Sequence, residues 1–459
     1  MHIQNPSRRK FLRNSYLAAA SAIAFPFIVP ASVMGPYSPS NQINVGMIGT
    51  GRQALQGNLR KGFLKLQNCR VLATNDVDRW RMNLATAEIK RAGHGGGTSG
   101  QEVREYEDYR DLIADKDVDA VMVSTPDHWH APATIAAALA GKHISMEKAF
   151  TLAPAWGSAV VGAVNKVGVT GRLDSEFRSL RPFNQAVELV HNGVIGNITH
   201  VEVGVPGELN GSAIAPQATM SVPKELNYDM WLGPAFPTPY TLHRVHDPQK
   251  IDTRPGWLRI SDYCNGMITN WGAHLNDIAL WGIRKELEAP ISVEGTGLFD
   301  QGLWNTINSF DLRYEYEDGT ILNYMIDVPY VKFYGDRGWV RVEYPDKLTS
   351  SKQEILDFEP GAGDVSYKNT RTDKADFLHG IETGQPTMED LDVGYNVYFL
   401  TFMGLLSVKL GRKLNWDAGA GQFINDNAAN AMLTHPFREK WLDNNVIDWM
   451  NRYQEIKLD

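Results

Sequence analysis

Short apolar runs alternate with helix-like segments over residues 36–170. The runs at 43–48, 71–76, 120–124 and 143–146 have the length and composition of buried strands. The segments at 52–66, 80–92, 106–114 and 131–140 have helical spacing of their apolar positions. Because strands that alternate with helices form parallel sheets, we expect a doubly wound α/β domain over residues 36–170.

The pattern changes over residues 171–459. An amphipathic segment at 182–193 predicts a helix, and alternating polar and apolar runs follow at 198–205, 291–299 and 309–316. Turn residues at 318–319 and 335–338 predict two hairpins, the first leading into a strand at 321–326. From Asp376 onward the chain has a mostly helical pattern. We therefore expect an α+β domain with an open, largely antiparallel sheet and C-terminal helices.

Residues 1–35 have the pattern of a signal peptide. Residues 7–12 (SRRKFL) match the twin-arginine export pattern, and an apolar stretch at 16–29 follows. This stretch is short and contains Pro26, which argues against a stable membrane anchor. The pattern favours export to the periplasm in folded form, and a basic cytosolic tail is the alternative.

The composition is that of a globular protein with two domains. The chain has 459 residues, 43% of them hydrophobic and 21% charged. Its net charge of -8 argues against nucleic acid as a partner. The two cysteines, Cys69 and Cys264, exclude a disulfide framework and a cysteine-rich metal cluster.

The turn after the first predicted strand carries a dinucleotide-binding fingerprint. Residues 49–54 have the G-x-G-x-x-A form of the Rossmann fold, whose glycines allow a tight turn and close approach of a pyrophosphate. Asp76 ends the second strand, where a carboxylate meets the ribose 2′-OH, so NAD is favoured over NADP, although Arg79 keeps NADP open. A structural turn with a surface aspartate is the alternative. The residues of the turn that we assign to the cofactor are Gly49, Thr50, Gly51, Arg52 and Gln53.

Polar residues also follow the third and fourth predicted strands. Ligands of doubly wound sheets bind outside the carboxyl ends of the strands, so these residues are candidates for the same site. Those that we assign to the cofactor are Ser124, Thr125, Pro126, His128, His130, Glu147 and Lys148.

Several motifs together resemble the Gfo/Idh/MocA oxidoreductase family (glucose–fructose oxidoreductase, inositol dehydrogenase and rhizopine catabolism). In the first half they are STPDHWH at 124–130, AGKH at 140–143 and MEK at 146–148. In the second half they lie at 226–235, 256–259, 270–277, 410–417 and 436–438. The resemblance extends over nearly the whole chain after the N-terminal segment.

The resemblance implies an NAD(P)-dependent enzyme that transfers a hydride to or from a hydroxyl of a sugar or polyol. It also implies a second domain that binds substrate and often contacts another subunit, so we expect a homo-oligomer. By motif, the family's lysine is Lys148 and its active-site histidine is His274, while Trp257 and Arg259 are placed in substrate binding.

The chemistry of alcohol oxidation requires a base at the hydroxyl, because the carbon loses a hydride and the oxygen a proton. His274 suits that role since histidine titrates near neutrality, and Lys148 can position the hydroxyl or relay its proton. The family commonly has aspartate where Asn270 stands and proline where Ala149 stands. Asn270, one helical turn before His274, can hold a hydroxyl but cannot accept its proton.

Other interpretations of these residues stay open. His274 is alternatively a satisfied core histidine. Asp277 either orients His274 or forms a helix cap or salt bridge, and Arg178 either binds sugar hydroxyls or lies in a solvated loop. His243 and His246 have metal-ligand spacing, but no third ligand set follows, so we predict no metal.

The main functional prediction is a periplasmic oxidoreductase that transfers a hydride between a tightly bound NAD(P) and a hydroxyl or keto group of a sugar, glycoside or polyol. A rival is NAD-dependent glycoside hydrolysis, in which the same cofactor oxidises the sugar, permits elimination and water addition, and then reduces it. A non-catalytic sugar or nucleotide binder is a third possibility, disfavoured because both Lys148 and His274 are present.

Overall fold

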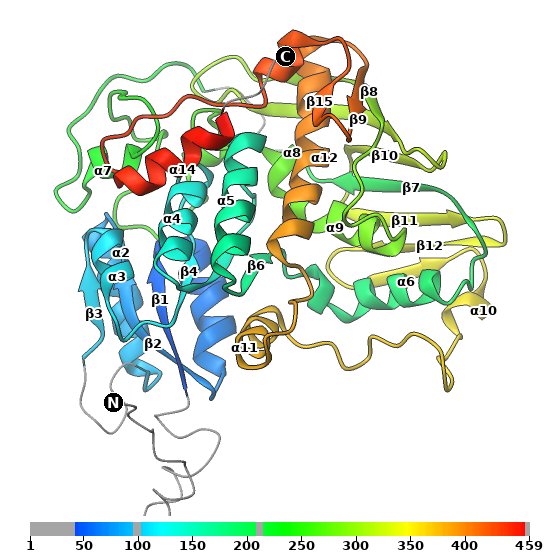
Figure 1. Cartoon of the computed structure of the whole chain (residues 1–459), viewed down its shortest axis with the longest axis horizontal. Helices are drawn as coiled ribbons and strands as arrows, with labels where there is room; N and C mark the ends of the chain where they lie inside the picture. The colour runs from blue at the N-terminus through cyan, green and yellow to red at the C-terminus, as the bar shows by residue number, and fades with distance from the viewer. Residues whose placement is uncertain (1–41, 95–101, 208–213, 455–459) are drawn as a thin grey trace, which may run out of the picture. The chain divides into compact units, whose positions relative to one another are not determined.

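The first predicted strand lies in the middle of a six-stranded parallel sheet. The computed structural model describes residues 42–94, 102–207 and 214–454, so the predicted signal peptide lies outside the described residues. The strand order is β3-β2-β1-β4-β5-β6, with every pair parallel (Figure 1). The doubly wound prediction is confirmed. The bounds are β1 Ile43–Ile48, β2 Cys69–Asn75, β3 Arg104–Tyr106, β4 Ala120–Val123, β5 His143–Glu147 and β6 Gly171–Asp174.

The helices between these strands differ from the prediction in three places. The first crossover is π-helical over η2 (Ala54–Gly62) and ends in the 3-10 turn η3 (Phe63–Lys65), in a segment where two glycines lower helical propensity. The helix predicted at 106–114 begins three residues later, as α3 (Tyr109–Ala114) with Asp108 as its N-cap, and Tyr106 belongs to β3 instead. The others are α2 (Arg79–Arg91), α4 (Asp127–Leu139) and α5 (Pro154–Val167), and α4 begins four residues before its predicted start at 131.

The second half of the chain forms a nine-stranded sheet of order β13-β12-β11-β7-β10-β9-β8-β14-β15. All pairs are antiparallel except β7 with β10, so the largely antiparallel prediction is confirmed. The predicted hairpins are β9–β10 and β11–β12. The bounds are β7 Ile198–Val205, β8 Ser292–Phe299, β9 Ile307–Glu315, β10 Ile321–Ile326, β11 Tyr330–Gly335, β12 Gly338–Glu343, β13 Lys347–Ser350, β14 Leu414–Asp417 and β15 Gln422–Phe423.

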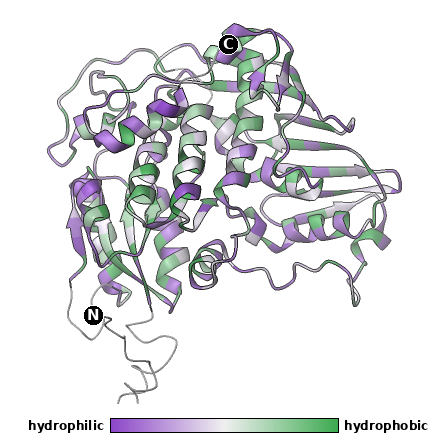
Figure 2. Cartoon of the chain, viewed as in Figure 1, coloured by the Kyte–Doolittle hydropathy of each residue, from purple (hydrophilic) through white to green (hydrophobic). Residues whose placement is uncertain are grey.

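Helices α6 (Arg181–His191), α9 (Gly272–Gly282) and α12 (Leu391–Leu410) pack with this sheet. Helix α12 is long and apolar enough to cross a membrane, but 72% of its apolar stretch is buried inside the protein, against α5, α9 and β8. In Figure 2 the ribbon of this helix has the hydrophobic colour at many of its residues, which fits a core helix. The remaining helices are η5 Phe177–Ser179, α7 Tyr228–Leu232, η6 Gly256–Arg259, α8 Met267–Asn270, α10 Gln353–Leu356, α11 Asp373–Thr383, α13 Asn427–Ala431 and α14 Asn444–Gln454.

Residues 222–258, which we call the cover segment, leave the second half of the chain and pack on the first sheet's domain. Leu226 forms a β-bridge with Asp78, and Arg81 Nη2 donates to the Lys250 carbonyl at 2.8 Å. Gln56 Nε2 donates to Asp252 Oδ1 at 2.7 Å. The cover segment is therefore attached to the N-terminal end of α2 and to η2.

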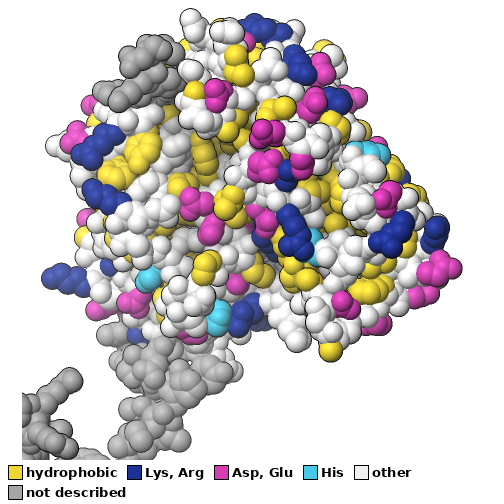
Figure 3. Space-filling model, turned by 45° about the vertical axis from the view of Figure 1, so that its right-hand side comes forward, with side chains coloured by type: hydrophobic (Ala, Val, Ile, Leu, Met, Phe, Trp, Pro, Cys, Tyr) yellow, Lys and Arg dark blue, Asp and Glu magenta, His cyan; other side chains and the backbone are white. Residues whose placement is uncertain are grey.

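The surface in Figure 3 mixes acidic, basic and apolar side chains. Binding of nucleic acid generally uses a stripe or patch of clustered lysine and arginine. On the face shown, the basic side chains are instead interspersed with acidic ones, in keeping with the net charge of -8.

Candidate active site

A cavity of about 570 Å³ lies at the carboxyl edge of the first sheet. The cover segment, the start of α9 and the end of β12 enclose it, so it is lined from both halves of the chain. A pocket at this edge is where doubly wound folds bind their ligands. The predicted site residues that line it are Gly49, Gly51, Arg52, Gln53, Asp76, Ser124, Thr125, Pro126, Glu147, Lys148, Trp257, Asn270 and His274.

The glycine turn fits a dinucleotide phosphate. Gly49 has φ +86°, and a Cβ there would lie 2.7 Å from the carbonyl oxygen of Ser124, so no larger residue fits. Gly51 faces open space, since a Cβ there would meet no atom within 4 Å. The turn thus has the close packing and the open approach that pyrophosphate binding needs.

Asp76 closes this turn from the end of β2. Its Oδ2 accepts hydrogen bonds from the backbone nitrogen and hydroxyl of Thr50, at 2.7 and 2.8 Å. Thr50, which we assigned to the cofactor, is fully buried and does not line the cavity, and Asp76 accepts hydrogen bonds from both of its donors. Burial, together with the charge of Asp78, raises the pKa of Asp76. The ribose contact of Asp76 stays a prediction.

The two histidines assigned to the cofactor, His128 and His130, do not line the cavity. Helix α4 begins at Asp127, so both lie in its first turn, fully buried. His128 Nε2 bonds the Trp231 carbonyl at 3.0 Å, and burial lowers its pKa to about 3. His130 Nε2 lies 2.9 Å from the Thr125 carbonyl and its Nδ1 2.7 Å from the Ala149 carbonyl. His130 therefore connects two loops of the site instead of binding a ligand.

His274 lies where the resemblance places it, beside Lys148 at the cavity. Its Nδ1 hydrogen bonds the Ser175 carbonyl, which can only accept, so Nδ1 carries the hydrogen and Nε2 is an acceptor. Phe177 stacks on the ring at 4.6 Å between centroids. Burial and the charge of Lys148 lower the pKa of His274 to about 3, so the ring is neutral near pH 7.

Arg178 and Arg259 were assigned to substrate, but neither lines the cavity. Arg178 is buried, with Nε 2.9 Å from Asp277 and Nη1 2.6 Å from the Met388 carbonyl. Asp277 is therefore a salt-bridge partner and does not orient His274. Arg259 is also buried and packs 4.4 Å from the centroid of the Trp304 ring.

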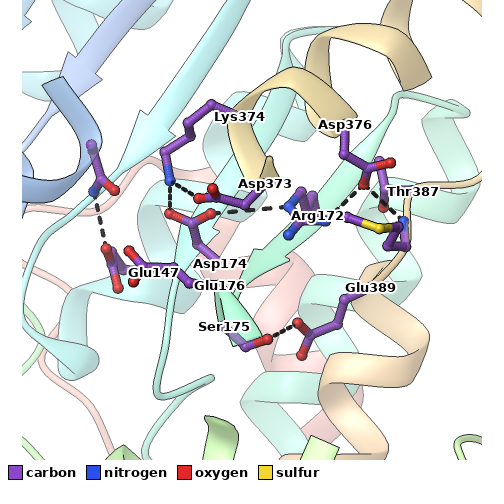
Figure 4. A network of polar contacts seen from close by, with 12 residues as sticks. Glu147, Arg172, Asp174, Ser175, Glu176, Asp373, Lys374, Asp376, Thr387 and Glu389 are labelled. Carbon is purple, nitrogen blue, oxygen red and sulfur yellow. Dashed lines mark hydrogen bonds and ion pairs between the residues drawn. The ribbon is translucent and has the colours of Figure 1, made fainter. Parts of the chain in front are cut away.

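A network of buried charges includes Glu147, the residue before Lys148 (Figure 4). Carboxylate atoms of Glu147, Asp174 and Glu176 lie within 4.8 Å of one another, so the three acidic groups need a nearby positive charge. Lys374 of α11 contacts Asp174 and so supplies a positive charge there. The charge of Asp174 raises the pKa of Lys374 although burial opposes it.

Several cavity residues were given no role from the sequence, although Trp271 lies within the motif at 270–277. Phe177, Trp271 and Tyr344 line the cavity with mutual ring contacts, including a nearly parallel pair of Phe177 and Tyr344 at 5.4 Å. They come from three separate elements, and a lone aromatic residue in each is more often part of a core. Arg254 lines the cavity from the cover segment in the same way.

Family models match both halves of this structure. The NAD-binding Rossmann fold of the oxidoreductase family matches residues 43–173, and the C-terminal alpha/beta domain of that family matches residues 185–443. The chain therefore belongs to the Gfo/Idh/MocA oxidoreductase family, an enzyme family whose nucleotide is NAD. This confirms the family and the cofactor expected from the motifs.

One relative in sequence and two solved structures are similar to this chain. A "Glycosyl hydrolase family 109 protein" of Stenotrophomonas maltophilia (strain K279a) is 25% identical over 201 residues, 43% of each chain, so this chain spans less than half of that relative's length. The aldose-aldose oxidoreductase of Caulobacter crescentus, solved with glycerol, is 17% identical with TM-score 0.58, covering 82% of this chain and all (100%) of that one. The WlbA dehydrogenase of Bordetella pertussis, solved with NADH and UDP-GlcNAcA, is 16% identical with TM-score 0.59, covering 82% and 99%. The two structures share the fold.

Proposed function

We propose that this protein is a carbohydrate oxidoreductase that retains NAD and transfers a hydride between it and a hydroxyl or keto group of a sugar, glycoside or polyol. The observation that carries the proposal is that Lys148 and His274 line one cavity with the glycine turn. A nicotinamide next to a lysine and a histidine is an arrangement suited to alcohol chemistry.

The residues have distinct roles in this proposal. Gly49 and Gly51 hold the pyrophosphate, and a bound nicotinamide supplies the hydride acceptor or donor. His274 Nε2 accepts a hydrogen bond from the reacting hydroxyl, Lys148 exchanges its proton, and the Asn270 amide holds a neighbouring hydroxyl. Because His274 is neutral near pH 7, it orients the hydroxyl more than it removes the proton.

A carbohydrate fits the lining of the substrate end. Trp257, Trp271 and Tyr344 offer aromatic faces, and His274 and Asn270 offer hydrogen bonds. Sugars have both apolar C–H faces and hydroxyls, so they match this combination. The aldose and nucleotide-sugar named with the two similar structures support the same substrate class.

Tight retention of NAD is supported by the cover segment. His246 lines the cavity and bonds Asp78 at 2.8 Å, next to the carboxylate of Asp76. The adenosine end would thus be enclosed by two parts of the chain. Retention also agrees with the proposed export in folded form, which rests on the twin-arginine pattern of residues 7–12. In this proposal the enzyme works in the periplasm, where a released cofactor would be lost. As the family resemblance implies, we also propose that the protein forms a homo-oligomer.

The test uses protein purified without added nucleotide. Mass spectrometry before and after incubation with a panel of sugars and polyols should find NAD in near-stoichiometric amount and its conversion to NADH by at least one of them. Protein that purifies empty, and in which no sugar reduces added NAD, would contradict the proposal.

The rival function, NAD-dependent glycoside hydrolysis, is favoured by the family 109 relative. Release of nitrophenol from a nitrophenyl glycoside without added cofactor, with no net change in bound NAD, would support the rival. Stable NADH formation without release would support the oxidoreductase.

A further inference from the structure

The proposed oxidation releases a proton, and neither predicted catalytic residue explains where it is held. His274 donates Nδ1–H to Ser175 and is surrounded by Phe177 and Lys148, so protonation at Nε2 is disfavoured. Lys148 can relay a proton only if another group accepts it. A third group facing the cavity is therefore needed.

Glu176 lies where such a group is needed. It lines the same cavity as Lys148 and His274, between the residue whose carbonyl binds His274 and the residue whose ring stacks on it. Its backbone is in the left-handed region, with φ +67°, which is uncommon for glutamate and is seen at functional sites. The same backbone turn thus positions both His274 and the Glu176 carboxyl.

The three carboxyls of the network have unequal partners (Figure 4). Asp174 contacts the Lys374 ammonium, and Glu147 accepts a hydrogen bond from the Asn58 amide at 3.0 Å. Glu176 accepts only a longer bond from Gln53, at 3.3 Å, and no ion pair within the described part of the chain involves it. Glu176 is therefore the most weakly held of the three carboxyls, and it can change its protonation state without breaking an ion pair.

The charges around Glu176 come from three elements. Glu147 lies at the end of β5 with Lys148 directly after it, Asp174 lies at the end of β6, and Asp373 and Lys374 lie at the start of α11. Burial and the charge of Glu147 raise the pKa of Glu176 above its ordinary 4.5, and Lys374 and Lys148 only partly oppose this. A carboxyl with a raised pKa is a better proton acceptor.

We propose that Glu176 accepts the substrate proton, by way of Lys148, and so completes the proton path of the function proposed above. In the oxidation the C–H bond breaks and its electron pair leaves with hydrogen to the nicotinamide of NAD. The O–H bond breaks, its electrons form the C=O bond, and its proton passes to the Lys148 amine. The amine has already given its own proton to the Glu176 carboxylate, which later releases it to water.

The kinetic test compares Glu176→Gln with Glu294→Gln, the same change at an exposed position of β8. We expect Glu176→Gln to lower kcat by about 100-fold or more, with little change in KM or in bound NAD, and to remove the acid limb of the pH profile. Glu176→Asp should keep that limb and part of the activity. Wild-type kcat and pH dependence in Glu176→Gln would overturn the proposal, and so would a change in KM alone. Should Glu176→Gln not fold, the Asp variant decides by whether it keeps the acid limb.

A second measurement needs no substrate. The infrared difference spectrum between NAD-loaded wild type and NAD-loaded Glu176→Gln should contain a protonated carboxyl band above pH 4.5, the ordinary value for glutamate. Absence of such a difference band would overturn the proposal. If the band is present but no sugar is oxidised, the proposed function fails and the proton site does not. If sugars are oxidised equally by both proteins, the proton site fails and the function stands.

Discussion

The nucleotide end and the substrate end of the cavity are built in different ways. The glycine turn of the nucleotide end comes from one continuous stretch, residues 43–54, whose strand, turn and helix adjoin in sequence. The substrate end is assembled from the chain after β6, the start of α9, the end of β12 and the cover segment. Local motifs can therefore reveal nucleotide binding, whereas substrate recognition emerges only once distant elements have packed. The two ends should respond separately to mutation.

The largest difference between the effect on turnover and the effect on nucleotide binding is expected from Lys148→Ala and His274→Ala. Each should lower turnover by about 10²–10⁴-fold and leave bound nucleotide nearly unchanged, because both residues belong to the substrate end. Single-turnover kinetics and nucleotide content measure the two effects. Turnover at the wild-type level in either variant would remove that residue from the mechanism.

Gly49→Val should instead act on nucleotide binding. Its positive φ and the approach of a Cβ to within 2.7 Å of Ser124 should cost about 1–3 kcal/mol of stability and expel the nucleotide. Gly411→Val is the matched control, since Gly411 has φ +66° but a Cβ there would meet no atom within 4 Å. Denaturation and nucleotide content of the two variants should differ, and equal retention of NAD would show that the turn tolerates a side chain.

A smaller effect concerns pH and the substrate end alone. The pKa of His274 is about 3 in the folded protein, against an ordinary value of 6.5. As pH falls below 6.5, His274 therefore binds a proton in the unfolded chain but not in the folded protein. Stability should therefore decline from pH 7 to pH 5, and by about 1–2 kcal/mol less in His274→Gln. Urea unfolding at both pH values measures this. Parallel declines in the two proteins would contradict it.

The smallest effect is expected from Asn270→Asp. The variant restores the residue common in the family, so turnover should stay within about tenfold, or 1.4 kcal/mol, of the wild type. Its pH profile should shift, because a carboxylate would join the cavity beside His274. A pH–rate series measures the shift, and complete inactivity would mean that the amide itself is required.

Sequence reasoning succeeded where the signal was local. The glycine turn, Lys148 at a strand end and the two hairpins all follow from adjacent residues, and the structure forms the strands and hairpins as predicted. Whether the cavity residues contact cofactor and substrate stays a prediction.

It failed where a partner was distant. Arg178 was assigned to substrate because it follows the first domain near the expected cleft. Its actual partner, Asp277, is 99 residues away in the sequence, and nothing near Arg178 indicates that salt bridge. Helix α4 begins earlier than predicted, so His128 and His130 lie in a buried helical turn where their rings bond backbone carbonyls of distant residues. Lys374 reaches Asp174 across 200 residues, a contact that no spacing rule predicts.

The attachment of the cover segment also sets an order of events during folding. Arg81 and the Lys250 carbonyl that it binds are 169 residues apart, so the ribosome completes the glycine turn long before the residues that enclose it. Contacts of such long range form late and slowly. A newly made first domain can meet NAD, but it can enclose the cofactor only after the second half of the chain has been synthesised and has docked, so firmly held NAD marks a chain whose folding is finished.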